Sequence, residues 1–150
     1  MASGQRLSRS MVERFLKGKD VKYLVDSDGD FQVRFGYDDD WGCGLDIWLT
    51  IQGQDADVYT IRAHADRRVP RDQWGQAIMM CNTWNCEKRW PKAYLHVGDA
   101  ESDSTGEIIL EEQLDTGDAG IHQELLDHLT LTIIAGCHLF WTWAHQEQGF

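Results

Sequence analysis

Strict alternation of apolar and polar side chains over residues 31–65 is the feature that most constrains how this chain can fold. The alternation occurs in three segments, whose apolar members are Phe31, Val33, Phe35 and Tyr37; Leu45, Ile47, Leu49 and Ile51; and Tyr59, Ile61, Ala63 and Ala65. Successive side chains of a β-strand point to opposite faces, so this period of two indicates strands with one buried face. The sequence therefore predicts an antiparallel meander with one covered and one solvent-exposed face.

Two helices are predicted on either side of this meander, where apolar residues recur at helical spacing. The first covers residues 10–17, in which Ser10 and Glu13 have the spacing of a capping box. The second begins at Pro70, because proline favours the first turn of a helix, and ends near Asn85. Its expected apolar face comprises Trp74, Ala77, Ile78, Cys81 and Trp84.

Further strands complete the predicted sheet. A short strand at 23–25 leads into an Asp-Gly hairpin turn at 26–30, and two more strands are expected at 93–97 and 106–114. The last of these has glutamates on both sides of an apolar centre, a pattern that suits an edge or half-covered strand. The predicted fold class is α+β, an antiparallel sheet with helices packed on it in the order α-β-β-β-(β)-α-β-β-α.

The last predicted helix, residues 120–145, is apolar on more than one side. Leu126, Ile134 and Trp141 lie off its main stripe, and the β-branched run at 130–134 would also suit a strand, although length favours a helix. A helix of this kind needs cover on more than one side, and a partner subunit is one way to supply it. The expected stripe is Ile121, Leu125, Leu129, Thr132, Ile133, Gly136, Phe140 and Trp143.

The composition is that of one folded domain. The chain has 150 residues and a net charge of −11, so we expect a single domain over 1–150 with flexibility only in residues 1–8. An acidic surface repels phosphates, which argues against nucleic acid and anionic membranes as partners and favours basic partners. Because no signal peptide or membrane-length apolar run is seen, we expect a cytoplasmic protein whose four cysteines are reduced.

Motifs for catalysis or metal binding are weak. Residues 26–30 (DSDGD) alternate carboxylates as a calcium loop does, but Phe31 and Tyr37 stand where an EF-hand requires Gly and Glu. Cys81 and Cys86 would point about 140° apart on a helix, which disfavours a zinc site. The sequence has no phosphate-binding, dinucleotide-binding or hydrolase motif. We therefore expect no metal, no cofactor and no enzymatic activity.

Three tryptophans are the candidate partner-binding residues. Trp48 lies on the polar face of its strand, between Asp46 and Thr50, where an aromatic side chain suggests cover by a helix, a second subunit or a bound peptide. Trp41 and Trp90 fall in predicted loops, where they would be available to a partner.

A candidate structural motif surrounds the end of the second predicted helix. Asn82 and Asn85 stand where asparagine side chains cap a helix or fix the chain that follows, which here runs through Pro91 into the next strand. Trp84 lies between them on the apolar face and is expected in the core.

An ordered set of short segments runs through the chain: 28–31 (DGDF), 81–85 (CNTWN), 89–94 (RWPKAY), 120–126 (GIHQELL) and 140–141 (FW). Together these segments resemble the YbjN family of bacterial domains, described as sensory transduction regulators. The resemblance covers about residues 10–143, and that family is similar in fold to the type III secretion chaperones. It implies a small homodimer without catalytic residues that offers a surface to another protein, and it names no partner.

The expected function is that of a non-enzymatic, protein-binding regulator or chaperone-like adaptor. It would act as a homodimer and bind a protein or peptide of basic character. A small-molecule sensor, with a pocket between the sheet and the last helix, is the alternative. A thiol or metal protein that uses Cys81 and Cys86 is a third hypothesis.

Overall fold

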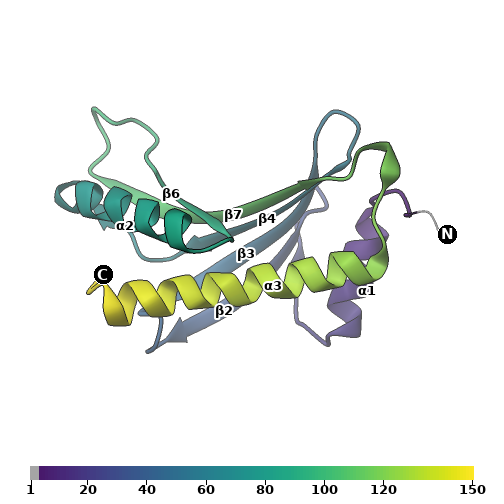
Figure 1. Ribbon diagram of the computed structural model, residues 1–150, viewed down its shortest axis with the longest axis horizontal. Helices are drawn as coiled ribbons and strands as arrows, with labels where there is room; N and C mark the ends of the chain where they lie inside the picture. The colour runs from purple at the N-terminus through teal and green to yellow at the C-terminus, as the bar shows by residue number, and fades with distance from the viewer. Residues whose placement is uncertain (1–3) are drawn as a thin grey trace.

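Residues 4–150 of the computed structural model form three α-helices and one antiparallel sheet (Figure 1). The helices are α1 (Arg9–Gly18), α2 (Trp74–Glu87) and α3 (Gln123–Thr142), with short helical turns η1 (Arg71–Gln73), η2 (Gly117–Ala119) and η3 (Trp143–Glu147). The strands are β1 (Leu24–Val25), β2 (Phe31–Asp38), β3 (Cys43–Gln52), β4 (Val58–Ala65), β5 (Val69–Pro70), β6 (Lys92–His96) and β7 (Thr105–Asp115).

The sheet has the order β1-β2-β3-β4-β7-β5, and β6 also pairs with β7. Every pairing is antiparallel. The predicted α+β class, the meander and the short first strand with its hairpin turn are therefore confirmed. The strand β7 is longer than expected and is central, because it lies between β4 and β6. It is half-covered, as its pattern allowed, but it is not an edge strand.

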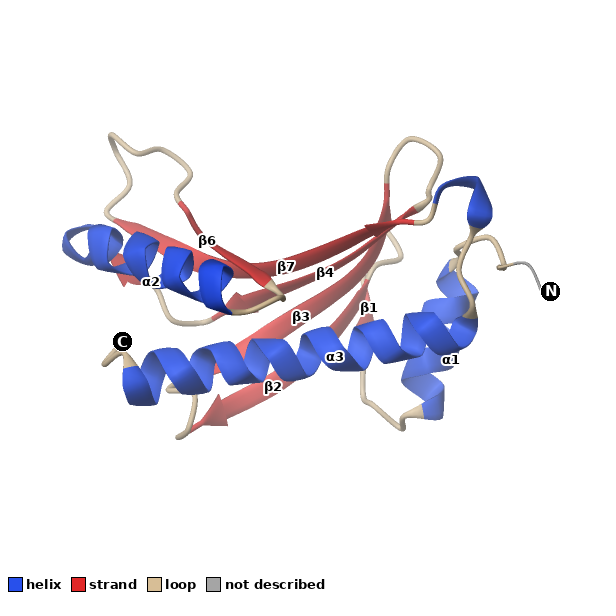
Figure 2. Ribbon diagram, viewed as in Figure 1, coloured by secondary structure: helices blue, strands red, loops and turns tan. Residues whose placement is uncertain are grey.

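All three helices contribute to one core on one face of the sheet (Figure 2). The alternating apolar side chains of β2, β3 and β4 form the sheet side of that core, and Ile47, Leu49 and Tyr59 have no accessible surface. In Figure 1 the long helix α3 runs across the sheet, with α2 beside it over β6 and β7. The opposite face of the sheet therefore carries the polar members of the alternation.

The first helix begins one residue earlier than predicted and is capped differently. The hydroxyl of Ser8 accepts a hydrogen bond from the Met11 amide at 3.4 Å, so Ser8 and not Ser10 is the N-cap. Residues 1–3, part of the segment expected to be flexible, lie outside the described residues. From Gly4 onward the chain is held by a β-bridge between Gln5 and Ile121, and Leu7 is buried in the core.

The second helix starts at Trp74 after the turn η1, not at Pro70, and continues to Glu87. Its buried residues are Ala77, Met80, Cys81 and Trp84, whereas Ile78 is 54% exposed. Ile78 was expected on the buried face, but it lies about 100° from Ala77 around the helix. Met80 takes that place in the core.

The third helix buries a different stripe from the predicted one. Its buried members are Leu126, Thr130, Ile133, Gly136, Cys137, Phe140 and Trp141. Leu126 and Trp141, expected off the stripe, are fully buried, and Leu125, expected on it, is 50% exposed. Gln123–Glu147 is long and apolar enough to cross a membrane by length and composition, a test that the core helix of a soluble protein also meets. Here its buried stripe packs on the sheet.

Candidate functional site

The helix-free face of the sheet carries a row of polar and aromatic side chains that face each other across five strands. The pairing register places Gln32 of β2 opposite Trp48 of β3, Trp48 opposite Arg62 of β4, Arg62 opposite Glu111 of β7, and Glu111 opposite Lys92 of β6. Directly opposite side chains on one face lie about 4.5–5.5 Å apart at Cβ, so these five form a continuous ladder.

Glu111 is the electrostatic centre of this ladder, although its side chain is only 5% exposed. It accepts hydrogen bonds from the guanidinium of Arg62, and Lys92 Nζ lies 3.1 Å from its other oxygen. Burial alone would raise the pKa of Glu111, but the contacts with Lys92 and Arg62 outweigh it and lower that pKa. A second acidic side chain, Glu107, contacts His64 Nδ1 at 3.0 Å and Arg68 at 3.4 Å.

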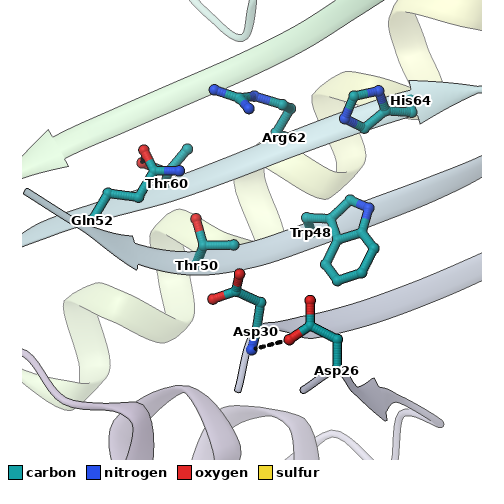
Figure 3. A pocket seen from close by; sticks show the side chains of 8 residues that line it. All are labelled: Asp26, Asp30, Trp48, Thr50, Gln52, Thr60, Arg62 and His64. Carbon is teal, nitrogen blue, oxygen red and sulfur yellow. Dashed lines mark hydrogen bonds between the residues drawn. The ribbon is translucent and has the colours of Figure 1, made fainter. Parts of the chain in front are cut away.

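A pocket of about 260 Å³ opens on this face beside the ladder (Figure 3). Trp48 lies at one side of it, and the carboxylates of Asp26 and Asp30 lie beside Trp48 at the edge nearest the β1–β2 turn. Burial, followed by the nearby carboxylates of Asp26 and Asp28, raises the pKa of Asp30. The other lining residues are Thr50, Gln52, Thr60, Arg62 and His64.

The β1–β2 turn holds its carboxylates in place through its own backbone. Asp26 Oδ1 accepts hydrogen bonds from the amides of Asp28 and Asp30, both at 2.9 Å, and Gly29 adopts a φ of 84° that favours glycine. The guanidinium of Arg9 lies directly against Gly29. The three carboxylates come within 4.8 Å of one another. Exposed acidic groups are common without a metal, and this cluster is no evidence for one.

The other two candidate tryptophans lie away from this face. The ring of Trp41 stacks on His138 of α3, with centroids 4.3 Å apart and planes 13° apart, and is partly buried. Trp90 is 43% exposed and lines a separate groove with Leu139 of α3. The structure therefore does not bring Trp41 and Trp90 together with Trp48.

His138 gives a testable pH dependence. Burial lowers its pKa, and Nε2 is buried with no hydrogen-bond partner among residues 4–150. Because the folded pKa is lowered, stability is full above the unfolded pKa of about 6.5 and falls as the pH drops below it. We expect His138→Phe, which keeps a flat ring against Trp41, to gain on the order of 1 kcal/mol at pH 8 and more at pH 5. Urea unfolding at both pH values measures this.

The exposed His96 supplies the control for that experiment. His96→Phe should change stability little at either pH. An equal gain from His138→Phe at pH 8 and pH 5 would contradict the account of His138.

The candidate structural motif is divided between the core and the surface. The indole of Trp84 donates a hydrogen bond to the Pro91 carbonyl at 2.8 Å, and the Asn85 amide makes two hydrogen bonds with the Ala93 backbone, at 2.9 and 3.0 Å. These contacts fasten the end of α2 to the start of β6. Asn82 is exposed and makes no side-chain hydrogen bond among the described residues.

The cysteines and histidines do not form a recognisable reactive pair. Cys43, Cys81 and Cys137 are buried, and burial raises the pKa of each thiol to about 12, which disfavours the nucleophilic thiolate. Cys86 is exposed, so it lies on a different side of α2 from Cys81. Within residues 4–150, no hydrogen bond joins a cysteine to a histidine.

The sequence did not reveal the charged ladder. Arg62 and Glu111 are 49 residues apart, and only the β4–β7 register places them opposite each other. The sequence does show that both residues are polar members of the alternation in their strands. The alternation gives the face of the sheet on which each side chain lies, but not the residue that lies opposite it on the next strand. Trp48 was identified because it is an aromatic residue at a position where the alternation of its strand is otherwise polar.

An antiparallel sheet with helices on one face and an open polar face on the other defines a class of small, one-sided α+β domains. Within that class, the chain belongs to the YbjN family. The model of this family, described as "putative bacterial sensory transduction regulator", matches residues 8–146. The description is that of a regulator.

A solved structure agrees with this assignment. The crystal structure of YbjN from E. coli has a TM-score of 0.73 to this chain at 11% sequence identity, and the match covers 95% of this chain and 94% of that chain. At this identity the likeness establishes the fold alone. No curated protein matches the chain.

Proposed function

We propose that this chain is a non-enzymatic regulator that binds a basic segment of another protein on the helix-free face of its sheet. The observation that carries the proposal is the position of Trp48, partly exposed at a pocket where Asp26 and Asp30 supply carboxylates. Neither carboxylate forms an ion pair within residues 4–150.

The chemistry of the pocket fits a lysine or arginine side chain. The face of an indole ring attracts a cation, and two nearby carboxylates add to that attraction. Arg62, an arginine that lines the pocket, is already bound by Glu111. A cationic side chain would also relieve the repulsion that helps to raise the pKa of Asp30.

The size of the pocket favours a side chain over a free small molecule. Pockets for drug-sized ligands are roughly 300–1,000 Å³, and this one is about 260 Å³. The alternative site, between the sheet and α3, is occupied by protein. There Tyr59 bonds to Thr130 at 2.7 Å, and both residues are at most 1% exposed, as are Phe140 and Trp141.

The same proposal includes a homodimer that acts as a chaperone-like adaptor in the cytoplasm. A helix exposing several leucines to water is unusual for a monomer, because exposed apolar patches mark interaction surfaces. On α3, Leu125, Leu131 and Leu139 are 43–63% exposed. The buried free thiols suit a reducing compartment.

A peptide titration tests the binding site. The probes are a twelve-residue peptide with four lysines and a matched peptide in which norleucine replaces each lysine. Isothermal titration calorimetry measures the affinity of every variant, and the indole N–H signal of Trp48 by NMR locates the site in the wild type. We expect the basic peptide to bind more tightly, and Trp48→Ala to weaken it about tenfold, in line with a cation–π contribution of up to about 2 kcal/mol.

Charge variants separate the pocket from the overall acidity of the protein. Asp26→Asn with Asp30→Asn should weaken binding of the basic peptide, whereas Asp72→Asn with Asp118→Asn, on exposed turns elsewhere, should not. Equal binding of both peptides, or equal loss from both pairs of variants, would remove the pocket from the proposal.

A further inference from the structure

The carboxylates of the pocket beside Trp48 have unused hydrogen-bonding capacity. Asp26 Oδ1 accepts hydrogen bonds from the amides of Asp28 and Asp30, and Asp26 Oδ2 accepts none within residues 4–150. The Asp30 carboxylate accepts no hydrogen bond from the described residues. Burial and the neighbouring carboxylates raise the pKa of Asp30, and the weaker influence of Arg9 does not offset them. The pocket therefore presents unpaired acceptor oxygens on two side chains.

The ring of Trp48 supplies a flat surface at the same pocket. Figure 3 shows this ring face-on, with the carboxylates of Asp26 and Asp30 at its edge nearest the β1–β2 turn. Four other aromatic rings of the described chain have an arginine or a lysine over one face, and the Trp48 ring has none. A group that stacks on the Trp48 ring therefore has the two carboxylates to one side.

The chain itself contains an arginine that is bound in this way. The guanidinium of Arg71 lies 4.5 Å from the centroid of the Trp74 ring, and its Nη2 donates hydrogen bonds to the carbonyls of Ala100 and Asp103, at 2.8 and 2.7 Å. Stacking and hydrogen bonding are compatible because the N–H groups of a guanidinium lie in its plane and leave its faces to an aromatic ring. Trp48 and its two carboxylates offer the same combination, with charged acceptors in place of carbonyls.

These features favour arginine over lysine. A lysine ammonium is a compact, strongly hydrated point charge, so it cannot pair with both oxygens of a carboxylate through a planar fork. A guanidinium can stack on Trp48, donate two N–H groups to Asp30 and donate another to Asp26, because one oxygen of each carboxylate lies within 4.8 Å of the other. Both side chains carry one positive charge, so the overall acidity of the protein does not distinguish them.

We propose that the pocket beside Trp48 binds an arginine side chain of the partner, with the guanidinium stacked on the indole and its N–H groups donated to the carboxylates of Asp26 and Asp30. This assignment rests on the proposed function and deepens it, because it names the residue of the basic segment that the site recognises. Trp48 then determines the specificity for arginine, and the two carboxylates supply the opposite charge.

Three peptides of equal length test the assignment by isothermal titration calorimetry at about 150 mM salt. They carry arginine, lysine or citrulline at the same four positions of a twelve-residue sequence, and citrulline keeps the planar shape of arginine without its charge. We expect the arginine peptide to bind about fivefold more tightly than the lysine peptide, equivalent to about 1 kcal/mol. The citrulline peptide should bind at least about tenfold more weakly than the arginine peptide.

Two variants locate the preference at the pocket. Trp48→Leu keeps an apolar surface but offers no aromatic face, so it should reduce the preference for arginine over lysine to below about twofold. Trp90→Leu is the matched control, because Trp90 is 43% exposed and lines a separate groove, and it should keep the preference of the wild type. Thermal unfolding of each variant verifies that the fold is intact.

A modified peptide tests the hydrogen bonds to the carboxylates. Asymmetric dimethylarginine keeps the positive charge of arginine but blocks the paired N–H donation. A peptide with dimethylarginine at the four positions should therefore bind the wild type no more tightly than the lysine peptide. Binding equal to that of the arginine peptide would overturn the proposed hydrogen bonds to Asp26 and Asp30.

The outcomes separate this assignment from the proposed function. Arginine and lysine peptides that bind equally well, and both more tightly than citrulline, would overturn the assignment of arginine and leave the basic partner in place. Equal affinities for all three peptides would overturn both. A preference for arginine that survives Trp48→Leu would contradict the assignment, because arginine would then be recognised away from the indole.

Discussion

Trp84→Ala will lower the free energy of unfolding by about 3–5 kcal/mol, the range for removing a large aromatic side chain from a core. Trp84 is 3% exposed, and its ring contacts Phe140 and Trp143 of the C-terminal helix at centroid distances of 5.2 and 5.5 Å. Its N–H also satisfies the buried Pro91 carbonyl. The substitution therefore loosens three segments together: α2, α3 and the start of β6. Urea unfolding followed by circular dichroism measures the loss.

Two further variants apportion that loss. Trp84→Phe keeps much of the ring packing but leaves the Pro91 carbonyl without its donor, so it should cost about 1–3 kcal/mol. Trp74→Ala should cost less than Trp84→Ala, because Trp74 is only partly buried and packs under Arg71 at the start of α2. A loss below about 1 kcal/mol for Trp84→Ala would show that α2 and α3 are not joined through this residue.

The sheet could be predicted from the sequence because its alternation is unambiguous. Along β3 and β4 every second side chain is apolar, which is the pattern of a strand with one buried face and one face exposed to water. Ile47 and Ile61, expected inside, are at most 1% exposed. A two-residue period leaves only two choices of face, and the apolar set selects one of them.

The helices were harder because apolar residues surround much of α2 and α3. With Leu125, Leu126 and Leu129 close together, more than one stripe can be drawn, and only contact with the sheet decides which is buried. The predicted stripe mixed core residues such as Phe140 with residues of the exposed side such as Leu125. We expected a second side of α3 to need cover, whichever of its stripes is buried. The exposed leucines of α3 are consistent with that expectation.

The charged ladder could not be predicted because it depends on register between distant strands. Trp48 was identified from its own strand alone, since a single aromatic side chain breaks the polar phase. Glu111 instead resembled one more exposed glutamate of a polar strand face. Its side chain is nevertheless only 5% exposed and contacts Arg62 and Lys92, which come from two other strands.

Arg62→Met will destabilise the fold by about 1–3 kcal/mol at pH 7, because it leaves the carboxylate of Glu111 buried with Lys92 as its one ion-pair partner among the described residues and the Tyr94 hydroxyl at 3.5 Å. The estimate is below the cost of breaking a fully buried pair, since the Arg62 side chain is 36% exposed and Lys92 remains. Arg34→Met is the matched control. Its partner Asp46 is 44% exposed, so that loss should stay within about 0.5 kcal/mol.

The pH dependence of that loss identifies Glu111 as its source. The folded pKa of Glu111 is lowered, so its contribution is fully present above the unfolded value of about 4.3 and is lost as the pH falls through the folded pKa. The gap between wild type and Arg62→Met should therefore be constant from pH 7 to pH 5 and narrow below about pH 4.

A double variant completes the test of Glu111. Arg62→Met with Glu111→Met should be more stable than Arg62→Met alone, because removing both charges removes the unpaired one, and buried ion pairs are often replaced by apolar side chains at little cost. The test is urea unfolding of the wild type, Arg62→Met, Arg34→Met and the double variant. The pH runs from about 3 to about 7, a range that spans the reference carboxylate pKa of roughly 4. If Arg62→Met loses no more stability than Arg34→Met, the Arg62–Glu111 contact behaves as a solvent-exposed ion pair. Glu111 then does not stabilise the sheet face on which Trp48 lies.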